Sequence, residues 1–182
     1  MKKTALILVL ICCTGLGVAQ AQEFTLLSDQ MGGQLTNDQV YDGFGCSGKN
    51  ISPALKWVHA PASTKSFAIT VYDPDAPTGS GWWHWVVFNI PAGSASLPAD
   101  AGNPKKALAP KDSVQSVTDF GNPGFGGACP PKGDRPHRYV FTVYALDVEK
   151  LNLDAKASPA MVGFTLNMHA IEKASLIAYY GR

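Results

Sequence analysis

Two histidines and an aspartate in this chain stand at the ends of hydrophobic runs that have the composition of β-strands. Asp73 ends the run KSFAITVYD, His84 lies near the start of WWHWVVFNI, and His137 opens HRYVFTVYAL. Within its run, His137 shares a strand face with Tyr139. If the three strand ends meet, these side chains converge at one end of an apolar wall. Pockets for small ligands are built in this way, from mostly apolar walls and a few polar groups.

His84 is the most unusual of these residues because it lies among three tryptophans. Alternation along a strand predicts that it shares a face with Trp82, Val86, Phe88 and Ile90. A core position would more simply hold another apolar residue, so the histidine indicates a ligand pocket with aromatic walls. A hydrogen-bonded histidine that only packs in the core is the alternative.

The segment DPDAP contains two aspartates, Asp73 and Asp75. Pro74 and Pro77 fix their own φ angles and push the residues before them towards extended conformations. Either aspartate can then accept hydrogen bonds from turn amides. The pattern leaves two roles open for Asp73, a turn residue or part of a ligand site.

Several kinds of catalytic and cofactor site can be tested against the sequence. It has no G-x-S-x-G elbow and no G-x-x-x-x-G-K-[ST] phosphate loop, and its D-F-G at 119–121 lacks the other protein-kinase motifs. Two histidines and an aspartate could hold a metal ion, but they come from separate runs with no short ligand spacing. We therefore predict no metal, no cofactor and no catalytic residue.

The elements that must position these residues are mostly strands. One helix is predicted, because Ser158 can cap it, Pro159 suits its first position, and apolar residues recur from Met161 to Ile171. The segment 93–136 is rich in turn residues, and a loop of that length is usually functional or disordered. The sequence thus predicts a β-rich single domain with few helices. Short runs rich in β-branched and aromatic residues predict strands at 24–28, 65–73, 84–90, 138–146 and 175–180.

Residues 1–21 have the pattern of a cleaved secretory signal peptide. Lys2 and Lys3 precede an apolar run and an A-Q-A cleavage site, and the run is shorter than the roughly 20 residues that span a bilayer. Cleavage would leave residues 22–182 as one bacterial domain with no transmembrane segment, periplasmic or secreted. The formal net charge would change from +1 to −1. No block of like charge stands out, which argues against nucleic acid as a partner.

Two cysteines, Cys46 and Cys129, remain after such a cleavage. Export would put them in an oxidising compartment, where a disulfide between them is the simplest interpretation. Closing so long a loop would stabilise the fold by about 4–5 kcal/mol in the chain-entropy model. Two free buried thiols are the alternative.

Taken together, DPDAP, WWHWVVFNIP and CPPKGDRPHRYVFTVYAL resemble the two signature regions of the phosphatidylethanolamine-binding protein (PEBP) family, also called Raf kinase inhibitor protein-like. GFGCSGKNISPALKW at 43–57 is similar to the bacterial YbhB/YbcL branch, so the resemblance covers nearly all of residues 22–182. It implies a mainly β fold in which a central antiparallel sheet packs on a smaller sheet with peripheral helices. It also implies a small anion pocket at one end of the sheet.

The resemblance also assigns ligand-binding roles to individual residues. This chain has Cys129 immediately before the proline pair, where family members often have glycine. A disulfide between Cys129 and Cys46 would therefore restrain the pocket loop in this chain. The pocket residues that the resemblance implies are two histidines, two aspartates, an aromatic wall, a tyrosine and two loop prolines, namely His84, His137, Asp73, Asp75, Trp82, Tyr139, Pro130 and Pro131.

Three functions compete at this point. The first is a non-catalytic protein that binds a small anionic ligand, such as a phosphate or phosphoethanolamine head group. The second is an interaction protein that inhibits a protease, or engages a host or envelope protein, through the pocket loops. The third is an enzyme with His84 or His137 as acid–base and Asp73 as its orienting partner, which is disfavoured because no activated nucleophile is visible. A protein partner and a homodimer are both compatible with the sequence.

The two histidines also predict a pH dependence. A phosphate beside them would raise the pKa of both imidazoles. The affinity for phosphate should therefore increase as the pH falls from about 8 to about 6.

Overall fold

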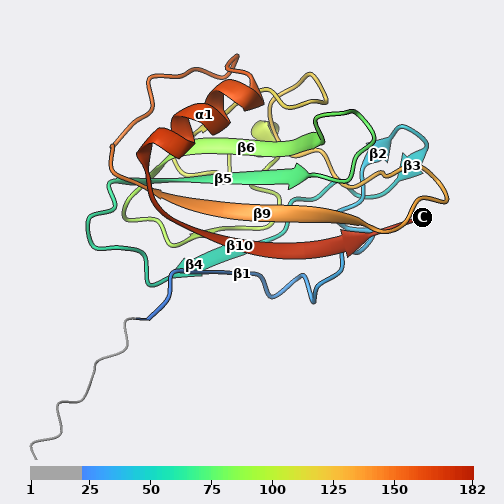
Figure 1. Cartoon of the computed structure of the whole chain (residues 1–182), viewed down its shortest axis with the longest axis horizontal. Helices are drawn as coiled ribbons and strands as arrows, with labels where there is room; N and C mark the ends of the chain where they lie inside the picture. The colour runs from blue at the N-terminus through green and yellow to red at the C-terminus, as the bar shows by residue number, and fades with distance from the viewer. Residues whose placement is uncertain (1–21) are drawn as a thin grey trace, which may run out of the picture.

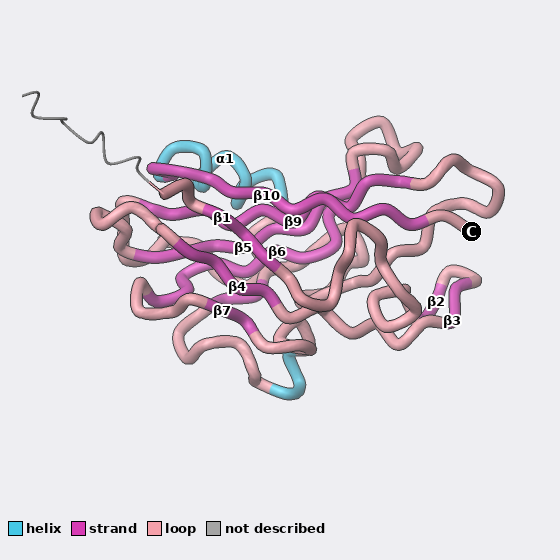
Figure 2. Tube along the Cα trace, turned by 90° about the horizontal axis from the view of Figure 1, so that it is seen from below, coloured by secondary structure: helices cyan, strands magenta, loops and turns pink. Residues whose placement is uncertain are grey.

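The computed structural model describes residues 22–182, and the predicted signal peptide at 1–21 lies outside the described residues. The described part has three layers: a three-stranded sheet, a five-stranded sheet and an α-helix (Figure 1, Figure 2). The predicted fold class, a central antiparallel sheet packed on a smaller sheet, is confirmed. Among these residues, no helix is long and apolar enough to cross a membrane.

The central sheet contains five antiparallel strands in the order β10-β9-β5-β6-β8. β5 pairs with β6 and with β9, which places Asp73 opposite Trp82 and Tyr72 opposite Val140. The end of β5 and the starts of β6 and β9 therefore lie together at one edge of the sheet. The strands are β5 (Ser66–Asp73), β6 (Trp82–Pro91), β8 (Val114–Gln115), β9 (His137–Leu146) and β10 (Ala170–Tyr180).

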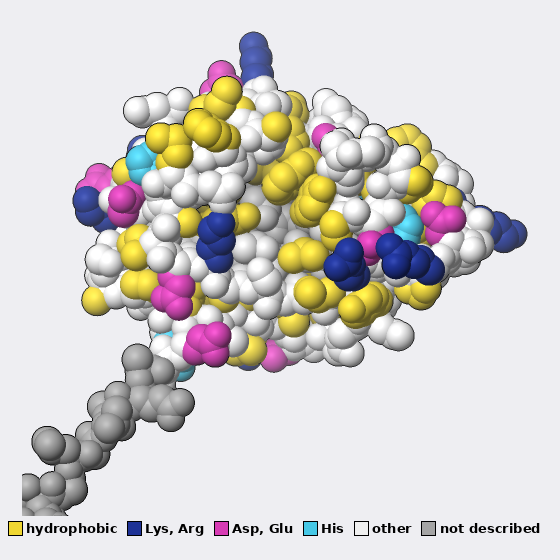
Figure 3. Space-filling view, viewed as in Figure 1, with side chains coloured by type: hydrophobic (Ala, Val, Ile, Leu, Met, Phe, Trp, Pro, Cys, Tyr) yellow, Lys and Arg dark blue, Asp and Glu magenta, His cyan; other side chains and the backbone are white. Residues whose placement is uncertain are grey.

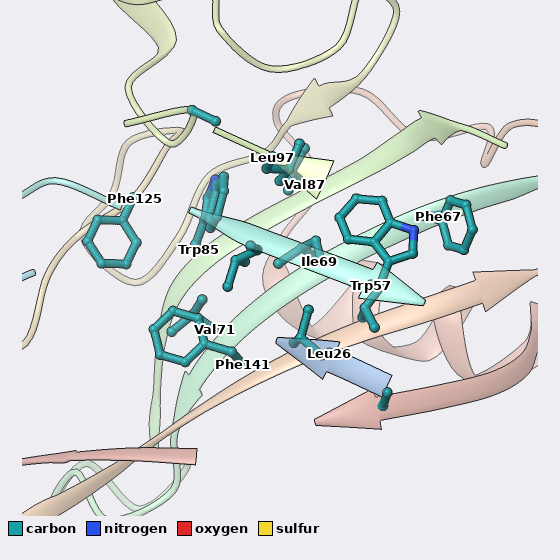
Figure 4. Close-up of a cluster of buried hydrophobic side chains, with 14 of the residues drawn as sticks. Leu26, Trp57, Phe67, Ile69, Val71, Trp85, Val87, Leu97, Phe125 and Phe141 are labelled. Carbon is teal, nitrogen blue, oxygen red and sulfur yellow. The ribbon is translucent and has the colours of Figure 1, made fainter. Parts of the chain in front are cut away.

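A smaller sheet covers one face of the central sheet, with the strand order β1-β4-β7. The main hydrophobic core lies between the two sheets and includes Trp57, Trp85 and Phe141 (Figure 4). Burial of one large apolar side chain contributes roughly 1.5–3 kcal/mol, so this core holds the two sheets together. The short strands are β1 (Thr25–Leu27), β4 (Leu55–Val58) and β7 (Ser96–Leu97), with β2 (Asp42–Gly43) and β3 (Cys46–Ser47) forming a separate hairpin.

Helix α1 (Pro159–His169) covers the opposite face of the central sheet. The Met161 N–H donates a hydrogen bond of 3.3 Å to Ser158 Oγ, and Pro159 takes the first helical position, as the sequence predicted. Val162 and Leu166 belong to one apolar cluster with side chains of β5, β6 and β9. A short 3-10 helix, η1 (Pro104–Lys106), lies in the long segment between β7 and β8.

The predicted end of this helix is wrong by two residues. α1 ends at His169, and Ala170 and Ile171 begin β10. The apolar spacing continues past the last turn, but β10 pairs with β9 from Ala170 to Tyr180, so the ladder of hydrogen bonds sets the boundary. The predicted strand at 175–180 is the second half of β10.

The outer face of α1 is also apolar. Met161, Phe164 and Met168 are each more than half exposed. Figure 3 shows hydrophobic side chains gathered over the position of α1 in Figure 1. A helix that is apolar on both sides is unusual at the surface of a globular protein.

Strand β6 departs from regular alternation next to His84. Val71 lies opposite Trp85 but Tyr72 lies opposite Trp83, so His84 is an extra residue in the ladder. This arrangement is a β-bulge, which changes the direction of the side chains that follow it. A second irregularity precedes Ile90, where Asn89 has a φ angle of 58°.

The bulges make the predicted face of β6 wrong. Val86 and Phe88 pack on the α1 side of the sheet, whereas Ile90 packs between the two sheets. His84 and Trp82 point instead into a cavity at the edge of the sheet. Simple alternation fails here because each extra residue reverses the face of all the residues beyond it.

Candidate functional site

A cavity of about 230 Å³ opens at the edge where β5 ends and β6 and β9 begin. Its polar side chains include Asp73, His84, His137 and Tyr139. Among the described residues that line it, none is Lys or Arg, and Asp73 supplies the one carboxylate. The rest of the lining is mainly apolar and includes Phe44, Trp82, Phe120, Pro77, Pro130 and Pro131.

Asp73 and His137 form a pair at the inner end of the cavity. His137 Nδ1 donates a hydrogen bond of 2.8 Å to Asp73 Oδ2. The other oxygen, Oδ1, accepts from the backbone N–H groups of Asp75 at 2.8 Å and Ala76 at 3.1 Å. The carboxylate thus holds the DPDAP turn and lines the cavity as well, so the two roles left open by the sequence coexist.

The second ring nitrogen of His137 also faces a carboxylate. Its Nε2 lies 3.4 Å from Asp134 Oδ2, on the loop that leads into β9. Both ring nitrogens of His137 are therefore directed at acidic oxygens. The ring itself is 2% exposed.

His84 is held by the loop that follows β8. Its Nδ1 donates a hydrogen bond of 2.7 Å to the Gly126 carbonyl, and the Gly126 N–H donates in return to the His84 carbonyl at 2.8 Å. Because a carbonyl can only accept, the proton of the neutral ring stands on Nδ1. Nε2 is buried without a hydrogen-bond partner. Burial lowers the pKa of His84, which favours the neutral ring.

Tyr139 packs against His84 from β9, with the two ring centroids 5.1 Å apart and edge to face. Its hydroxyl is buried and has no hydrogen-bond partner. Burial raises the pKa of Tyr139, so the hydroxyl keeps its proton and can donate it to a ligand. Two side chains of the cavity lining thus carry a buried polar atom without a partner in the protein, His84 Nε2 and Tyr139 Oη. Two other such atoms among the described residues, Trp57 Nε1 and Ser116 Oγ, belong to residues outside this lining.

Asp75 lies outside the cavity lining and binds arginine instead. Its oxygens accept from the Arg138 side chain at 2.8 and 2.9 Å and from Arg135 at 2.8 Å. The hydrogen bond from Arg138 is the main reason that the pKa of Asp75 lies well below its ordinary value. Asp75 therefore fixes the DPDAP turn to the start of β9 and supports the site from outside.

Two phenylalanines that the sequence reasoning missed complete the apolar wall. The rings of Phe44 and Phe120 are stacked with centroids 5.8 Å apart, and Trp82 meets Phe120 edge to face at 5.5 Å. Each phenylalanine lies in a glycine-containing loop and belongs to no strand. A large apolar residue in such a loop, with no strand face to pack on, is the signal that could have found them.

The sulfur atoms of Cys46 and Cys129 lie at disulfide-bonding distance, with Cα atoms 6.0 Å apart. Cys129 lines the cavity, and Cys46 belongs to the β2–β3 hairpin. This candidate disulfide connects the hairpin next to Phe44 with the loop that contains Pro130.

Asp73, His84 and His137 are residue types that can also bind metal ions. Within residues 22–182, no group of three or more His, Cys, Asp or Glu side chains is arranged to hold a metal ion. Asp73 and His137 are hydrogen-bonded to each other, and His84 Nδ1 donates to a carbonyl, so these atoms already have partners within the protein.

We compared the chain with protein families and with known proteins. A model of the family described as phosphatidylethanolamine-binding protein matches residues 28–181. The chain belongs to the phosphatidylethanolamine-binding protein family. Its relatives include the UPF0098 protein YbcL of Escherichia coli strain K12, which is 54% identical over 164 residues, 89% of this chain and 90% of that protein. The UPF0098 protein YbhB of the same strain is 52% identical over 149 residues, 82% of this chain and 93% of that protein.

A solved structure supports the same membership. The crystal structure of E. coli YbcL, described as a new member of the mammalian PEBP family, matches with a TM-score of 0.86 at 53% identity. The match covers 88% of this chain and 99% of that one. A PEBP homologue from Chlamydia trachomatis, CT736, matches with a TM-score of 0.71 at 28% identity, over 87% of this chain and 97% of that one.

Membership of the PEBP family confirms the resemblance, including the similarity to YbhB and YbcL. The roles of the individual residues stay predictions. Of the residues to which the resemblance gave a ligand-binding role, Asp75 is the one that does not line the cavity.

Proposed function

We propose that this PEBP-family chain is an exported bacterial protein that binds phosphate-type or phospholipid head groups and does not turn them over. The observation that carries the proposal is the pair of unpartnered polar atoms, His84 Nε2 and Tyr139 Oη, in a cavity with aromatic walls. Buried polar atoms without partners are rare in native proteins, because leaving one unpaired costs about 1–3 kcal/mol. A bound polar ligand would supply the missing partners.

The size and lining of the cavity support a small ligand with one polar end. A volume of about 230 Å³ is enough for a head group and too small for most drug-sized ligands. The polar end would face His84 and Tyr139, and the rest would contact Trp82, Phe44 and Phe120 at the aromatic wall.

The candidate nucleophiles around the cavity support a non-catalytic role. The Thr78 hydroxyl donates a hydrogen bond to the Gly81 carbonyl, and Cys129 stands at bonding distance from Cys46. The tyrosine hydroxyl has a raised pKa, which makes it a poor nucleophile at neutral pH. An enzyme of the nucleophilic kind would need an activated group in one of these positions.

Calorimetric titration with O-phosphoethanolamine and with inorganic phosphate tests the proposal on oxidised protein that begins at residue 22. Saturable binding at one site per chain is expected, together with phosphorylated ligands in mass spectra of gently purified protein. Absence of binding to both compounds would contradict it. Export is tested separately: protein from the periplasm or the medium should begin at Gln22, the residue after the predicted cleavage site.

A second function, binding of a protein partner through the pocket loops, is favoured by one observation. Phe44 is 67% exposed at the mouth of the cavity, and its backbone has a φ angle of 53°. Its ring also packs beside those of Tyr41 and Phe120, and a contiguous exposed apolar patch is typical of an interaction surface. If this function holds, Phe44→Ala should abolish capture of a protease or envelope protein from a cell extract, and saturating O-phosphoethanolamine should not restore that capture.

A further inference from the structure

The cavity presents an imbalance of charge for a site that would bind an anion. Its described lining contains the Asp73 carboxylate but no Lys or Arg, and the arginines nearby bind Asp75 outside the cavity. A doubly charged anion entering this cavity would lie near Asp73 with no Lys or Arg in the lining to offset it. A proton on the ligand would lower its charge and weaken the repulsion from Asp73.

The hydrogen bonds of His84 determine whether its ring can donate to a ligand or accept from one. The Nδ1–H of the neutral ring is committed to the Gly126 carbonyl, so Nε2 carries the lone pair, and it is buried without a partner in a residue that lines the cavity. A neutral imidazole nitrogen of this kind accepts a hydrogen bond and cannot donate one. The oxygen of a fully ionised anion also only accepts, so the two atoms would face each other without a proton between them.

We propose that the cavity selects ligands that bring their own acidic proton, so that a protonated phosphate donates to His84 Nε2 while Tyr139 Oη donates to another phosphate oxygen. This inference deepens the proposed function and rests on it. It names the bound species as the monoanion of a phosphate or phosphate monoester. A tetrahedral anion that cannot carry a proton, such as sulfate, would leave the acceptor at His84 unpaired.

The alternative location for the proton is His84 itself. The acidic groups that face its ring are Asp73 from β5 and Asp119 from the loop after β8, and both favour the charged ring. His137 and Tyr139 of β9 line the same cavity, and His137 is paired with Asp73. Burial of the ring outweighs these contributions and lowers its pKa, which supports a proton on the ligand.

Titrations with phosphate and with sulfate distinguish a proton on the ligand from a proton on His84. The two anions have the same tetrahedral shape, but only phosphate carries a proton near neutral pH. Near neutral pH phosphate exchanges between monoanion and dianion, whereas sulfate stays a dianion. Oxidised protein that begins at residue 22 would be titrated with each anion between pH 5.5 and pH 8.5, pH values chosen around the ordinary range of histidine titration. Phosphate should bind at least about tenfold more tightly than sulfate at pH 6, because an unpaired buried acceptor costs about that factor. Above neutrality the phosphate affinity should fall by up to about tenfold per pH unit.

Each other result has a definite meaning. Sulfate that binds as tightly as phosphate, with an affinity that rises on acidification, would place the proton on His84 and overturn this inference while leaving the proposed function intact. Failure of phosphate and O-phosphoethanolamine to bind at any pH would overturn both.

Two variants sharpen the test. Tyr139→Phe removes a hydroxyl that has no partner in the protein, so it should keep the stability, weaken phosphate binding at every pH and leave the pH slope unchanged. His84→Asn can still offer an amide N–H towards Gly126, but its amide oxygen lies closer to the backbone and leaves no acceptor at the position of Nε2, so the preference for phosphate over sulfate should shrink towards one. A preference that survives in folded His84→Asn protein would also overturn the inference.

Discussion

His137 and Asp73 form a buried pair that joins the start of β9 to the end of β5. The two side chains are 2% and 4% exposed, and Nδ1 lies 2.8 Å from Oδ2. The chain contains a pair of the same type at the surface, where His169 Nδ1 lies 3.0 Å from Asp147 Oδ1 and the side chains are 33% and 59% exposed. The two pairs differ in burial more than in geometry, so each serves as a control for the other.

Asp73→Asn should therefore destabilise the protein much more than Asp147→Asn. The amide oxygen of asparagine can still accept from the turn, but its NH₂ group would face the Nδ1–H of His137. Leaving a buried donor unpaired costs about 1–3 kcal/mol, whereas the surface substitution should change the free energy of unfolding by less than about 0.5 kcal/mol. Urea unfolding at pH 7 measures both, and equal effects would mean that the buried pair contributes nothing special.

Asp75 should give the protein a pH-dependent part of its stability. The pKa of Asp75 is lowered in the folded state, chiefly by Arg138, so this carboxylate stabilises the fold at every pH above its unfolded pKa near ~4. The stabilisation is lost as the pH falls through the lower folded value. Asp75→Asn should lower the free energy of unfolding at pH 7 and make its decline below about pH 4 less steep. Urea unfolding at pH 7, 4 and 3 measures the difference.

Asp38 offers a matched control for this prediction. It also pairs with a cation, Lys49, but the two side chains are 48% and 62% exposed. Asp38→Asn should change the stability little at any pH. A loss for Asp75→Asn that is the same at pH 7 and pH 3 would show that the carboxylate charge is not the cause.

Trp82 and its neighbour Trp83 should separate ligand binding from packing. Trp82 lines the cavity, whereas Trp83 packs on the Tyr72 ring and the core beneath α1. Both are half-buried, and each change to Ala should cost about 1–3 kcal/mol of stability. Only Trp82→Ala should weaken the binding of O-phosphoethanolamine in calorimetric titrations. Equal affinities for the two variants would place the ligand elsewhere.

The sequence predicted β1 and the three inner strands of the central sheet well because their patterns are local, but it did not predict β2, β3, β4, β7 or β8. β5, β6 and β9 match the expected runs to within two residues, since each run is rich in β-branched and aromatic residues and is bounded by turn residues. The bulge at His84 could not be predicted, because it depends on how β6 pairs with β5 and leaves no mark in the spacing.

The site was predictable where it lies on strands and less so in its loops. Asp73, His84 and His137 stand at strand ends, so their convergence follows from pairing of the strands. Asp73 and Asp75 look alike in the sequence, and the arginines that bind Asp75 lie 60 and 63 residues further along the chain. Only the folded chain distinguishes the aspartate in the cavity from the one outside it.

The thiols of Cys46 and Cys129 should be absent from oxidised protein that begins at residue 22. Thiol titration in denaturant should find fewer than one reactive group per chain before reduction and two afterwards. The cysteines are 83 residues apart, and replacing both with alanine should lower the free energy of unfolding by about 4–5 kcal/mol in the chain-entropy model. Two reactive thiols in freshly isolated protein would remove the disulfide.

Arg182 should form a second connection, by hydrogen bonds, between the two segments that the Cys46–Cys129 disulfide joins. Its Nε donates to the Pro130 carbonyl at 2.7 Å and its Nη1 to the Gly45 carbonyl at 2.8 Å. The β2–β3 hairpin and the end of the described chain lie side by side in both views (Figure 1, Figure 2). One guanidinium thus joins the hairpin whose turn contains Phe44 to the proline loop of the cavity.

We therefore expect Arg182→Gln to weaken phosphate binding by a few-fold and to lower the stability by about 1.5–3 kcal/mol, because two carbonyls lose a charged donor. Arg182→Lys should recover little, since an ammonium group lacks the planar fork that reaches both oxygens. The loss of affinity should be larger when Cys46 and Cys129 are both alanine, because either the disulfide or the Arg182 hydrogen bonds can hold the hairpin in place. Calorimetric titration of the single and combined variants measures this coupling. Strictly additive losses would mean that Arg182 and the cysteines act on separate parts of the site.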